Sequence, residues 1–268
     1  MRKKLGYYRE HFKSKDALYR YKGEFGKDVL QFLKVHGIQL GNKKVLDIGC
    51  GFGGFGFLLI KNNAKVKMLE NDREKIKFIK EKIRQTGINF SRSNIRLGDA
   101  CKLPFRSNYF DLTVMLDVIE HVQSPEHCLK ESYRVLKKGG HCLLSSPPYY
   151  GPWGGHIKPP LTPIPIPYFH YIPKVFLMWF LKKRERQLSN SIDSDAYRGS
   201  EYYTLNKLGI AGIENVLMST GFETVHFSKS LALPWNFPII SRIFKPFLNL
   251  KYAQEFLAGN YTILLRKT

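Results

Sequence analysis

The residues of this chain best placed to do chemistry begin with a glycine-rich turn, VLDIGCGFGGFG, at positions 45–56. Two overlapping sets of its glycines fit the spacing G-x-G-x-x-G, which lets a backbone approach a ligand and presents a helix N-terminus to a polar group. Such a fingerprint indicates an adenosine-bearing cofactor without saying which one. Two acids near the turn, Asp47 and Glu70, narrow the choice.

Asp47, placed just before the first glycine, argues against a dinucleotide. A carboxylate suits a cationic ammonium group, such as that of methionine, whereas it would repel a pyrophosphate. Glu70 ends the next predicted strand, where an acid can accept hydrogen bonds from both hydroxyls of a ribose. NAD enzymes share this second acid, so it indicates an adenosine ribose but does not separate the two cofactors.

A framework of alternating strands and helices must position these residues, and the sequence predicts one. Apolar or alternating runs predict strands at 44–48, 64–72, 94–100, 109–119 and 141–147. The segment 124–140 before the last strand predicts a helix with Pro125 near its start and Gly139 after its end. Asp72 is well placed as an N-cap, and Gly87 as the end of that helix. Repeated alternation predicts a doubly wound α/β fold whose ligand lies at the carboxyl ends of parallel strands.

The order of these motifs resembles the class I S-adenosylmethionine-dependent methyltransferases, of the type 11 or ubiquinone–menaquinone methyltransferase-like kind. The resemblance covers 45–147 closely and 202–266 more loosely, and it rests on the acid before the glycines and on GDACKLPF, FDLTVMLDVIEHV and YRVLKKGG. It implies a mostly parallel, seven-stranded Rossmann-like sheet with an antiparallel last strand. Two further strands, at 222–228 and 260–267, would complete that sheet.

The resemblance also implies how S-adenosylmethionine would be held. Asp47 helps to hold its amino-acid part, Glu70 its ribose, and Asp99 its adenine amino group. The full set carried over is Asp47, Gly49, Cys50, Gly51, Gly53, Glu70, Asn71, Asp99, Ala100 and Leu116. Two structural alternatives stay open, because Asp47 could cap the following helix and Asp99 could form an ordinary turn.

Methyl transfer from a sulfonium mainly requires alignment of nucleophile, methyl carbon and sulfur in a dry pocket. A hydroxyl or an activated carbon acceptor also needs a general base. His121, beyond the fourth strand, and His156, in the segment that follows the fifth, are the catalytic candidates, and His170 is a third. Each of them has a structural alternative, as a capping, packing or surface histidine.

The segment around His121 is also a candidate site for a divalent metal ion. Asp117, Glu120 and His121 resemble the acid-x-x-Glu-His pattern with which ubiquinone-pathway O-methyltransferases bind a divalent metal, and two carboxylates with an imidazole suit one. However, Asp117 stands where that family has Glu, and the motif also occurs in members without metal. We therefore predict S-adenosylmethionine as the cofactor and no metal ion.

Charge is the unusual feature of the composition. The 268 residues include 43 Lys and Arg against 22 Asp and Glu, a formal net charge of +21. This surplus predicts attraction to nucleic acid, to an anionic membrane or to a phosphorylated substrate, with a merely well-solvated basic surface as the alternative. Four scattered cysteines, no signal-peptide pattern and no apolar run of about 18 residues favour a cytoplasmic protein with free thiols.

We expect a single methyltransferase domain over 1–268, with a basic helical segment at 1–43, a cofactor-binding core at 44–147, and lid insertions over the acceptor site at 148–201 and 229–256. The insertions are rich in proline, aromatic and basic residues, and 174–181 reads as a short apolar helix. They fit a buried lid, a hydrophobic acceptor pocket with a face toward a membrane, or an RNA-binding surface.

We favour the membrane interpretation, because the aromatic residues lie among Ile, Leu and Pro, whereas nucleic-acid platforms usually keep them among polar residues. The prediction is a methyltransferase that acts on a hydrophobic or lipid-like small molecule, peripheral on the inner face of the membrane. An RNA methyltransferase and a non-catalytic cofactor-binding protein are the alternatives. The oligomeric state is left open.

Overall fold

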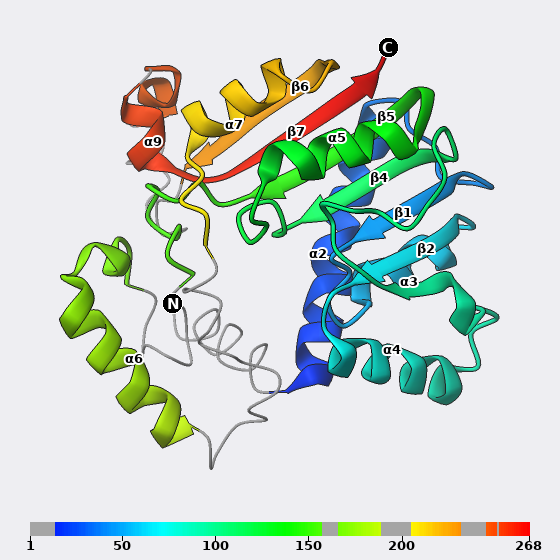
Figure 1. Ribbon diagram of the computed structural model, residues 1–268, viewed down its shortest axis with the longest axis horizontal. Coiled ribbons are helices and arrows are strands. Elements are labelled where there is room, and N and C mark those ends of the chain that lie inside the picture. Colours follow the sequence, from blue (N-terminus) through cyan, green and yellow to red (C-terminus); the bar gives the residue numbers. More distant parts are fainter. Residues whose placement is uncertain (1–13, 157–165, 189–204, 232–244, 251) are drawn as a thin grey trace.

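A seven-stranded sheet lies at the centre of the computed structural model, which describes residues 14–156, 166–188, 205–231, 245–250 and 252–268 (Figure 1). Its strand order is β3-β2-β1-β4-β5-β7-β6. The strands are β1 (Lys44–Ile48), β2 (Lys65–Glu70), β3 (Ile95–Leu97), β4 (Phe110–Leu116), β5 (Leu136–Ser146), β6 (Phe222–Leu231) and β7 (Ala258–Lys267). All pairs among β1 to β5 are parallel, and β7 is antiparallel to both β5 and β6. The predicted fold class is confirmed.

Helices cover both faces of this sheet. The α-helices among the described residues are α2 (Lys15–Val35), α3 (Gly54–Lys61), α4 (Arg73–Thr86), α5 (Pro125–Val135), α6 (Lys174–Leu188), α7 (Ile210–Met218) and α9 (Ala253–Leu257). Of these, α2, α3, α4, α5 and α7 supply residues to the buried clusters on the two faces of the sheet. Side chains of β1 alternate between two buried clusters, because neighbouring residues of a strand point to opposite faces. Val45 packs with apolar residues of α2, α3 and α4, and Leu46 packs with those of α5 and α7.

Local signals set several helix ends as predicted. The Asp72 side chain accepts a hydrogen bond from the N–H of Glu74 at 2.8 Å and so caps α4, which ends at Gly87 in the left-handed conformation. At α5, Ser124 caps the first turn and Pro125 begins the helix, where a missing N–H costs nothing.

Several element boundaries differ from the prediction, most of all at the start of β5. The helix predicted to end just before Gly139 ends at Val135, and β5 begins at Leu136 instead of His141. Leu136 is fully buried and pairs with Phe110, so tertiary packing draws it into the sheet despite the helical pattern before it. The third strand is also shorter than the predicted 94–100, since only Ile95–Leu97 pair with β2.

The predicted insertions are described only in part. Residues 1–13, 157–165, 189–204, 232–244 and 251 lie outside the described residues, and with them much of the predicted basic N-terminus and of both lids. Within the described part, α6 runs to Leu188, well beyond the predicted 174–181. It lies on the side toward which the arrowheads of β1, β2 and β4 point (Figure 1). No helix among the described residues has the length and apolar character to cross a membrane.

Candidate active site

The glycine turn joins β1 to α3 and opens toward a ligand. Gly49, Gly51 and Gly53 have φ angles of 66°, 57° and 82°, values that glycine adopts without strain. A Cβ atom on Gly49 would lie 2.6 Å from Val118, whereas one on Gly51 would meet nothing within 4 Å. Gly49 is therefore needed for packing, and Gly51 borders open space in which a cofactor can approach the backbone.

Asp47 lies just before this turn, and its carboxyl group is in an unusual environment. It is 3% exposed, and its Oδ2 atom has no hydrogen-bond partner. Burial raises the pKa of Asp47 to about 7; the charge of Lys22 lowers it and that of Glu70 raises it. Helix α3 has Gly53 at its N-cap and no side-chain cap, so the interpretation of Asp47 as a helix cap is wrong. A buried carboxylate oxygen without a partner fits the ammonium group of the cofactor's amino-acid part.

Glu70 holds the turn in place from the end of β2. One carboxylate oxygen accepts the N–H of Gly51 at 2.8 Å, and the other accepts those of Asn71 and Asp72 at 3.0 and 3.2 Å. A carboxylate has about four acceptor positions, so roughly one is left for a ribose hydroxyl. Glu70 thus shapes the site as well as facing it, a role that the sequence analysis missed.

The remaining cofactor candidates lie around the carboxyl ends of neighbouring strands. Asp99, an exposed residue, uses Oδ1 to accept the N–H of Cys101 at 2.8 Å, which agrees with the turn-forming alternative for that oxygen. Cys50 is buried and donates its N–H to the carbonyl of Leu69, and Leu116 is buried at the end of β4. The contacts of all these residues with the cofactor stay predictions.

Helix α2 contributes a cation that the sequence analysis did not single out. The Lys22 ammonium lies 2.7 Å from a carboxylate oxygen of Asp117, just past β4. Burial works against the charge on Lys22, but Asp117 outweighs it and the net effect raises the pKa of Lys22. The two residues are 95 positions apart, and no local pattern links them.

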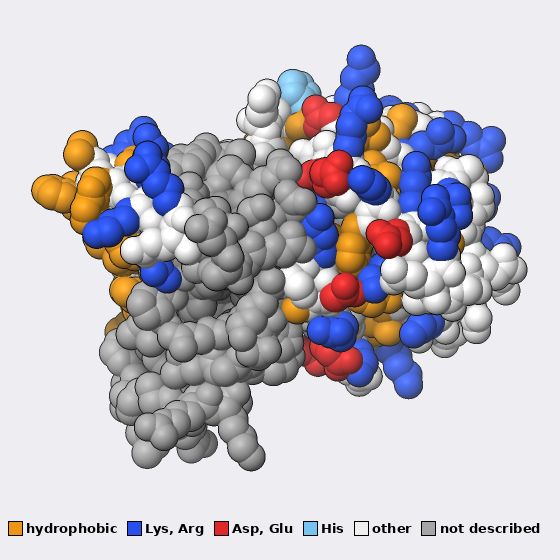
Figure 2. All heavy atoms as spheres, turned by 90° about the horizontal axis from the view of Figure 1, so that it is seen from below, with side chains coloured by type: hydrophobic (Ala, Val, Ile, Leu, Met, Phe, Trp, Pro, Cys, Tyr) orange, Lys and Arg blue, Asp and Glu red, His pale blue; other side chains and the backbone are white. Residues whose placement is uncertain are grey.

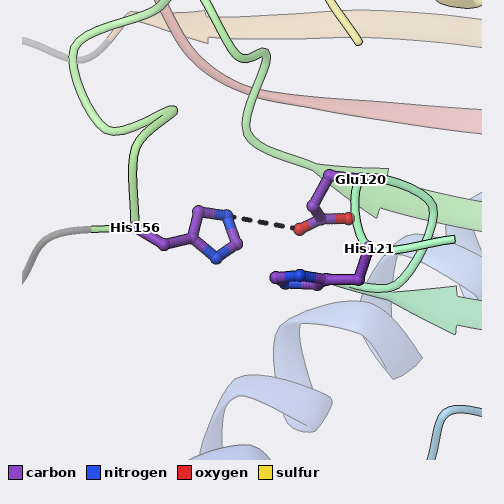
Figure 3. Close-up of side chains that lie close together, drawn as sticks. All are labelled: Glu120, His121 and His156. Carbon is purple, nitrogen blue, oxygen red and sulfur yellow. Dashed lines mark ion pairs between the residues drawn. The ribbon is translucent and has the colours of Figure 1, made fainter. Parts of the chain in front are cut away.

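Glu120, His121 and His156 come together beyond β4 and β5 (Figure 3). His156 Nε2 lies 3.4 Å from Glu120 Oε1, and the rings of His121 and His156 have centroids 4.9 Å apart at 75°. One ligand atom from each residue lies within 4.8 Å of the others, whereas Asp117 bonds Lys22. The metal set considered from the sequence, with Asp117 in it, is therefore not the set that the described residues bring together.

His170 is outside this group. Its ring packs against Tyr149 and Tyr171, with centroids 5.4 and 4.5 Å away, and burial lowers its pKa. A Cβ atom on Gly155 would collide with it. These contacts agree with the structural alternative for His170, a packing histidine beneath the turn that carries His156.

Asn206 fixes the loop that carries Glu120 and His121. Its side-chain amide donates to the carbonyls of Ile119 at 2.7 Å and Val122 at 2.9 Å, and its backbone N–H donates to the carbonyl of Glu120 at 2.9 Å. No sequence pattern indicates this role of Asn206, because the residue stands outside every motif and acts on a loop more than eighty positions away.

Comparison with known proteins agrees with this geometry. Residues 46–144 match the family model of the methyltransferase domain. Cycloartenol-C-24-methyltransferase 1 of Oryza sativa subsp. japonica is 36% identical over 122 residues, 42% of this chain and 35% of the rice protein. Demethylmenaquinone methyltransferase of Listeria monocytogenes is 25% identical over 202 residues, 73% of this chain and 76% of the bacterial protein. The chain thus spans about a third of the length of the plant relatives it matches.

A solved structure shows the same fold. Geranyl diphosphate C-methyltransferase from Streptomyces coelicolor, in complex with Mg²⁺, geranyl-S-thiolodiphosphate and S-adenosyl-L-homocysteine, has a TM-score of 0.57 and 13% identity, covering 90% of this chain and 76% of that one. The strand order of this chain agrees with the fold of that structure. The match of residues 46–144 to the methyltransferase-domain model agrees with the predicted class, and S-adenosylmethionine, the cofactor predicted from the sequence, is confirmed.

Proposed function

We propose that this chain transfers a methyl group from S-adenosylmethionine to a hydrophobic small molecule at the cytoplasmic surface of an anionic membrane. The observation that carries the methyl-transfer part is the buried Asp47 carboxyl beside the glycine turn, within a methyltransferase domain. Its partnerless oxygen suits a cationic amino acid, and a diphosphate at the same place would be repelled.

The hydrophobic nature of the acceptor is supported by the relatives. By their names, one acts on cycloartenol and another on demethylmenaquinone, both of them largely hydrocarbon molecules. The aromatic composition of the segments after β5 agrees with an acceptor of this kind.

Helix α6 supports the membrane part of the proposal. Val175, Phe176 and Trp179 are 78%, 67% and 63% exposed, although the opposite side of the helix buries Leu177 and Leu181. Apolar and basic side chains gather at the left edge of Figure 2, the side on which α6 lies in Figure 1. Such a helix face inserts its aromatic residues into lipid while basic residues meet anionic head groups.

The charge next to these aromatic residues is positive. Lys183 lies over the Trp179 ring, 5.1 Å from its centroid, and Lys182 and Arg186 are exposed on the same helix. The whole chain carries +21. Attraction to an acidic membrane surface would follow, and it would weaken with salt, because the screening length is only about 8 Å at physiological ionic strength.

Cofactor binding is tested by calorimetry with S-adenosylmethionine, S-adenosylhomocysteine and NAD. We expect the first two to bind and NAD not to bind. Radiolabelled cofactor added with cell extract then shows which fraction takes up label. Label in lipid is the expected result. Label in RNA would favour an RNA methyltransferase, and cofactor binding without label in any fraction would favour a non-catalytic cofactor-binding protein.

Membrane binding is tested by sedimentation with phosphatidylserine-containing vesicles. Burial of one large apolar side chain contributes about 1.5–3 kcal/mol, so the double variant Phe176→Ser, Trp179→Ser should bind at least about tenfold more weakly. The matched control is Val35→Ser, Met218→Ser, whose side chains are 70% and 78% exposed elsewhere. Equal binding of both double variants would contradict the membrane part and leave methyl transfer untouched.

A further inference from the structure

The Glu120–His156 pair joins two parts of the chain that are distant in sequence. Glu120 follows β4, and His156 ends the turn after β5, yet Nε2 of the imidazole lies 3.4 Å from the carboxylate (Figure 3). Both side chains are buried, at 3% and 7% exposure. Burying two titratable groups is unfavourable unless each interacts with the other, so the pairing calls for an explanation.

The backbone around the pair is held in strained positions. His156 has φ of 53° and Asp117 has φ of 57°, in the left-handed region that non-glycine residues enter at a cost of about 1–2 kcal/mol. Gly154, two residues before the histidine, has no room for a side chain, because a Cβ there would collide with the carbonyl of Tyr149. Strain of this kind, stored beside a buried polar pair, is typical of functional sites.

The pair faces the acceptor side of the cofactor site. It lies beyond the carboxyl ends of β4 and β5, where ligands of doubly wound sheets bind, and the charge of Lys22 acts on both Glu120 and Asp47. On β7, the Tyr261 hydroxyl is buried and makes no hydrogen bond of ordinary geometry among the described residues, although Ser146 lies close enough to affect it. A polar atom left without a partner at this depth is what a bound polar group would satisfy.

We propose that His156 is the catalytic base for an acceptor that carries a phenolic hydroxyl, and that Glu120 is the positioning residue that orients its imidazole. This inference rests on the proposed methyl-transfer function and names its substrate class. At 3.4 Å the contact is longer than an ordinary N–H···O hydrogen bond, so Glu120 acts on the imidazole mainly through its charge.

The step balances. As the hydroxyl proton moves to the imidazole, the phenolic oxygen forms a bond to the methyl carbon while the bond from that carbon to sulfur breaks. The electron pair of the broken bond stays on sulfur, so the sulfonium becomes a neutral sulfide and the positive charge moves to the imidazolium. Glu120, as a carboxylate 3.4 Å away, stabilises that imidazolium by its charge. Solvent then removes the proton.

Ordinary acidities favour a phenol over an aliphatic alcohol. An unperturbed imidazole has a pKa of about 6.5 and a phenol about 10, a gap of roughly 3.5 units. An aliphatic hydroxyl resembles water, with a pKa of about 15.7, and the gap grows to roughly 9 units. A histidine can therefore assist the deprotonation of a phenol much more readily than that of an aliphatic alcohol. A hydrophobic phenol also fits the acceptor class proposed above.

Several groups around Glu120 set its charge. Lys22 reaches it from α2, Asp117 lies beyond β4, Ser146 ends β5 and Tyr261 stands on β7. Burial raises the pKa of Glu120 and the charge of Asp117 adds to this, while Ser146 and Lys22 act in the other direction. Raising the pH therefore converts Glu120 to the carboxylate that the proposed role requires.

Nonylphenol tests the inference directly, because its phenolate has an ultraviolet absorption band that the neutral phenol lacks. The probe is added to the full chain loaded with S-adenosylhomocysteine at pH about 9, above the pKa of about 8 of Glu120 and below that of a phenol, about 10. We expect bound probe to ionise, with the band reduced at least about tenfold in His156→Gln and clearly reduced in Glu120→Gln. The control variants are His127→Gln and Glu126→Gln on the exposed start of α5.

The outcomes separate this inference from the proposed function. Three results would overturn the inference, even if S-adenosylhomocysteine binds and methyl label is transferred. The probe does not bind, it binds in its neutral form, or it ionises as strongly in His156→Gln and Glu120→Gln as in the parent chain. Loss of the band with chelator and its return with Mg²⁺ would assign the ionisation to a metal ion instead. Failure of cofactor binding in the unmodified chain would overturn the proposed function itself.

Discussion

In the cofactor half of this molecule, Asp47 and Glu70 lie at the ends of neighbouring strands and act on a turn that β1 feeds directly. In the acceptor half, Lys22 meets Asp117, His156 meets Glu120, and Asn206 holds the carbonyls around Glu120. The first set is arranged by the local order of strand, turn and helix. The second is assembled across the chain by packing. Cofactor chemistry can therefore stay constant while acceptor chemistry changes with a few distant contacts.

The two halves also differ in their surfaces. Apolar side chains of the core are buried between the sheet and its helices, whereas α6 exposes a Val–Phe–Trp face on the acceptor side. If the halves are independent, a variant in one should leave the function of the other intact. Variants of single residues in each half test that independence, and the largest change is expected at His156.

The largest effect is expected for His156→Gln. Removal of a general base typically lowers a rate by about 10²- to 10⁴-fold, so kcat for methylation of nonylphenol should fall by at least about 10². The dissociation constant of S-adenosylhomocysteine should stay within about twofold, since His156 belongs to the acceptor half. Rapid-quench kinetics with labelled cofactor measures the first quantity and calorimetry the second. A parallel loss of cofactor affinity would show that the halves are coupled.

Asp47→Asn should have the next largest effect, on the other half. Hydrogen bonds to a charged group contribute about 1.5–3 kcal/mol, so the dissociation constant of S-adenosylmethionine should rise by about 10- to 100-fold. Because the folded-state pKa of Asp47 is raised to about 7, stability present at low pH is lost as pH rises through that value. The ligand-free variant should therefore be more stable than the parent chain at pH about 8.

Calorimetry and thermal unfolding at that pH check both signs, with Glu126→Gln on α5 as the control. Weaker binding together with lower stability would mean that Asp47 supports the fold, and the assignment to the cofactor would fail. Calorimetry in two buffers adds an independent readout. Near pH about 6.5 the parent chain should release a proton when the cofactor binds, and the variant should not.

A pH profile should separate the halves more finely. Burial and Asp117 raise the pKa of Glu120 to about 8, so methyl transfer should increase as the pH rises through that value. Glu120→Gln should lose this rise and run about tenfold slower at pH about 9, by the magnitude typical of residues that orient a functional histidine. Cofactor affinity should show no such step. A profile that keeps its rise in the variant would assign the rise to another group.

The sequence predicted the cofactor half closely, because its signals act over short distances. The apolar run of β1, the cap at Asp72 and the stop at Gly87 depend on neighbours in the chain, and each element formed as expected. The start of β5 at Leu136 was missed, since pairing with Phe110 outweighs a helical pattern.

The sequence predicted less of the acceptor half, because the contacts there join residues that are far apart in the chain. His121 and His156 were recognised as candidates by residue type, but the 3.4 Å contact between His156 and Glu120 depends on the path of the whole segment between them. Nothing near Asn206 in sequence indicates that its amide would hold two carbonyls in a distant loop. Packing decides such contacts, and a single sequence carries no local record of them.

The smallest effect is expected on stability, from Trp179→Ser. A side chain 63% exposed contributes little to folding, so the free energy of unfolding should change by less than about 0.5 kcal/mol, although vesicle binding weakens. Leu181→Ala, on the buried side of the same helix, is the contrast and should cost about 2–5 kcal/mol. Urea unfolding followed by circular dichroism measures both. A large loss of stability in Trp179→Ser would show that this face is covered by protein, and the membrane contact of the acceptor half would have to be abandoned.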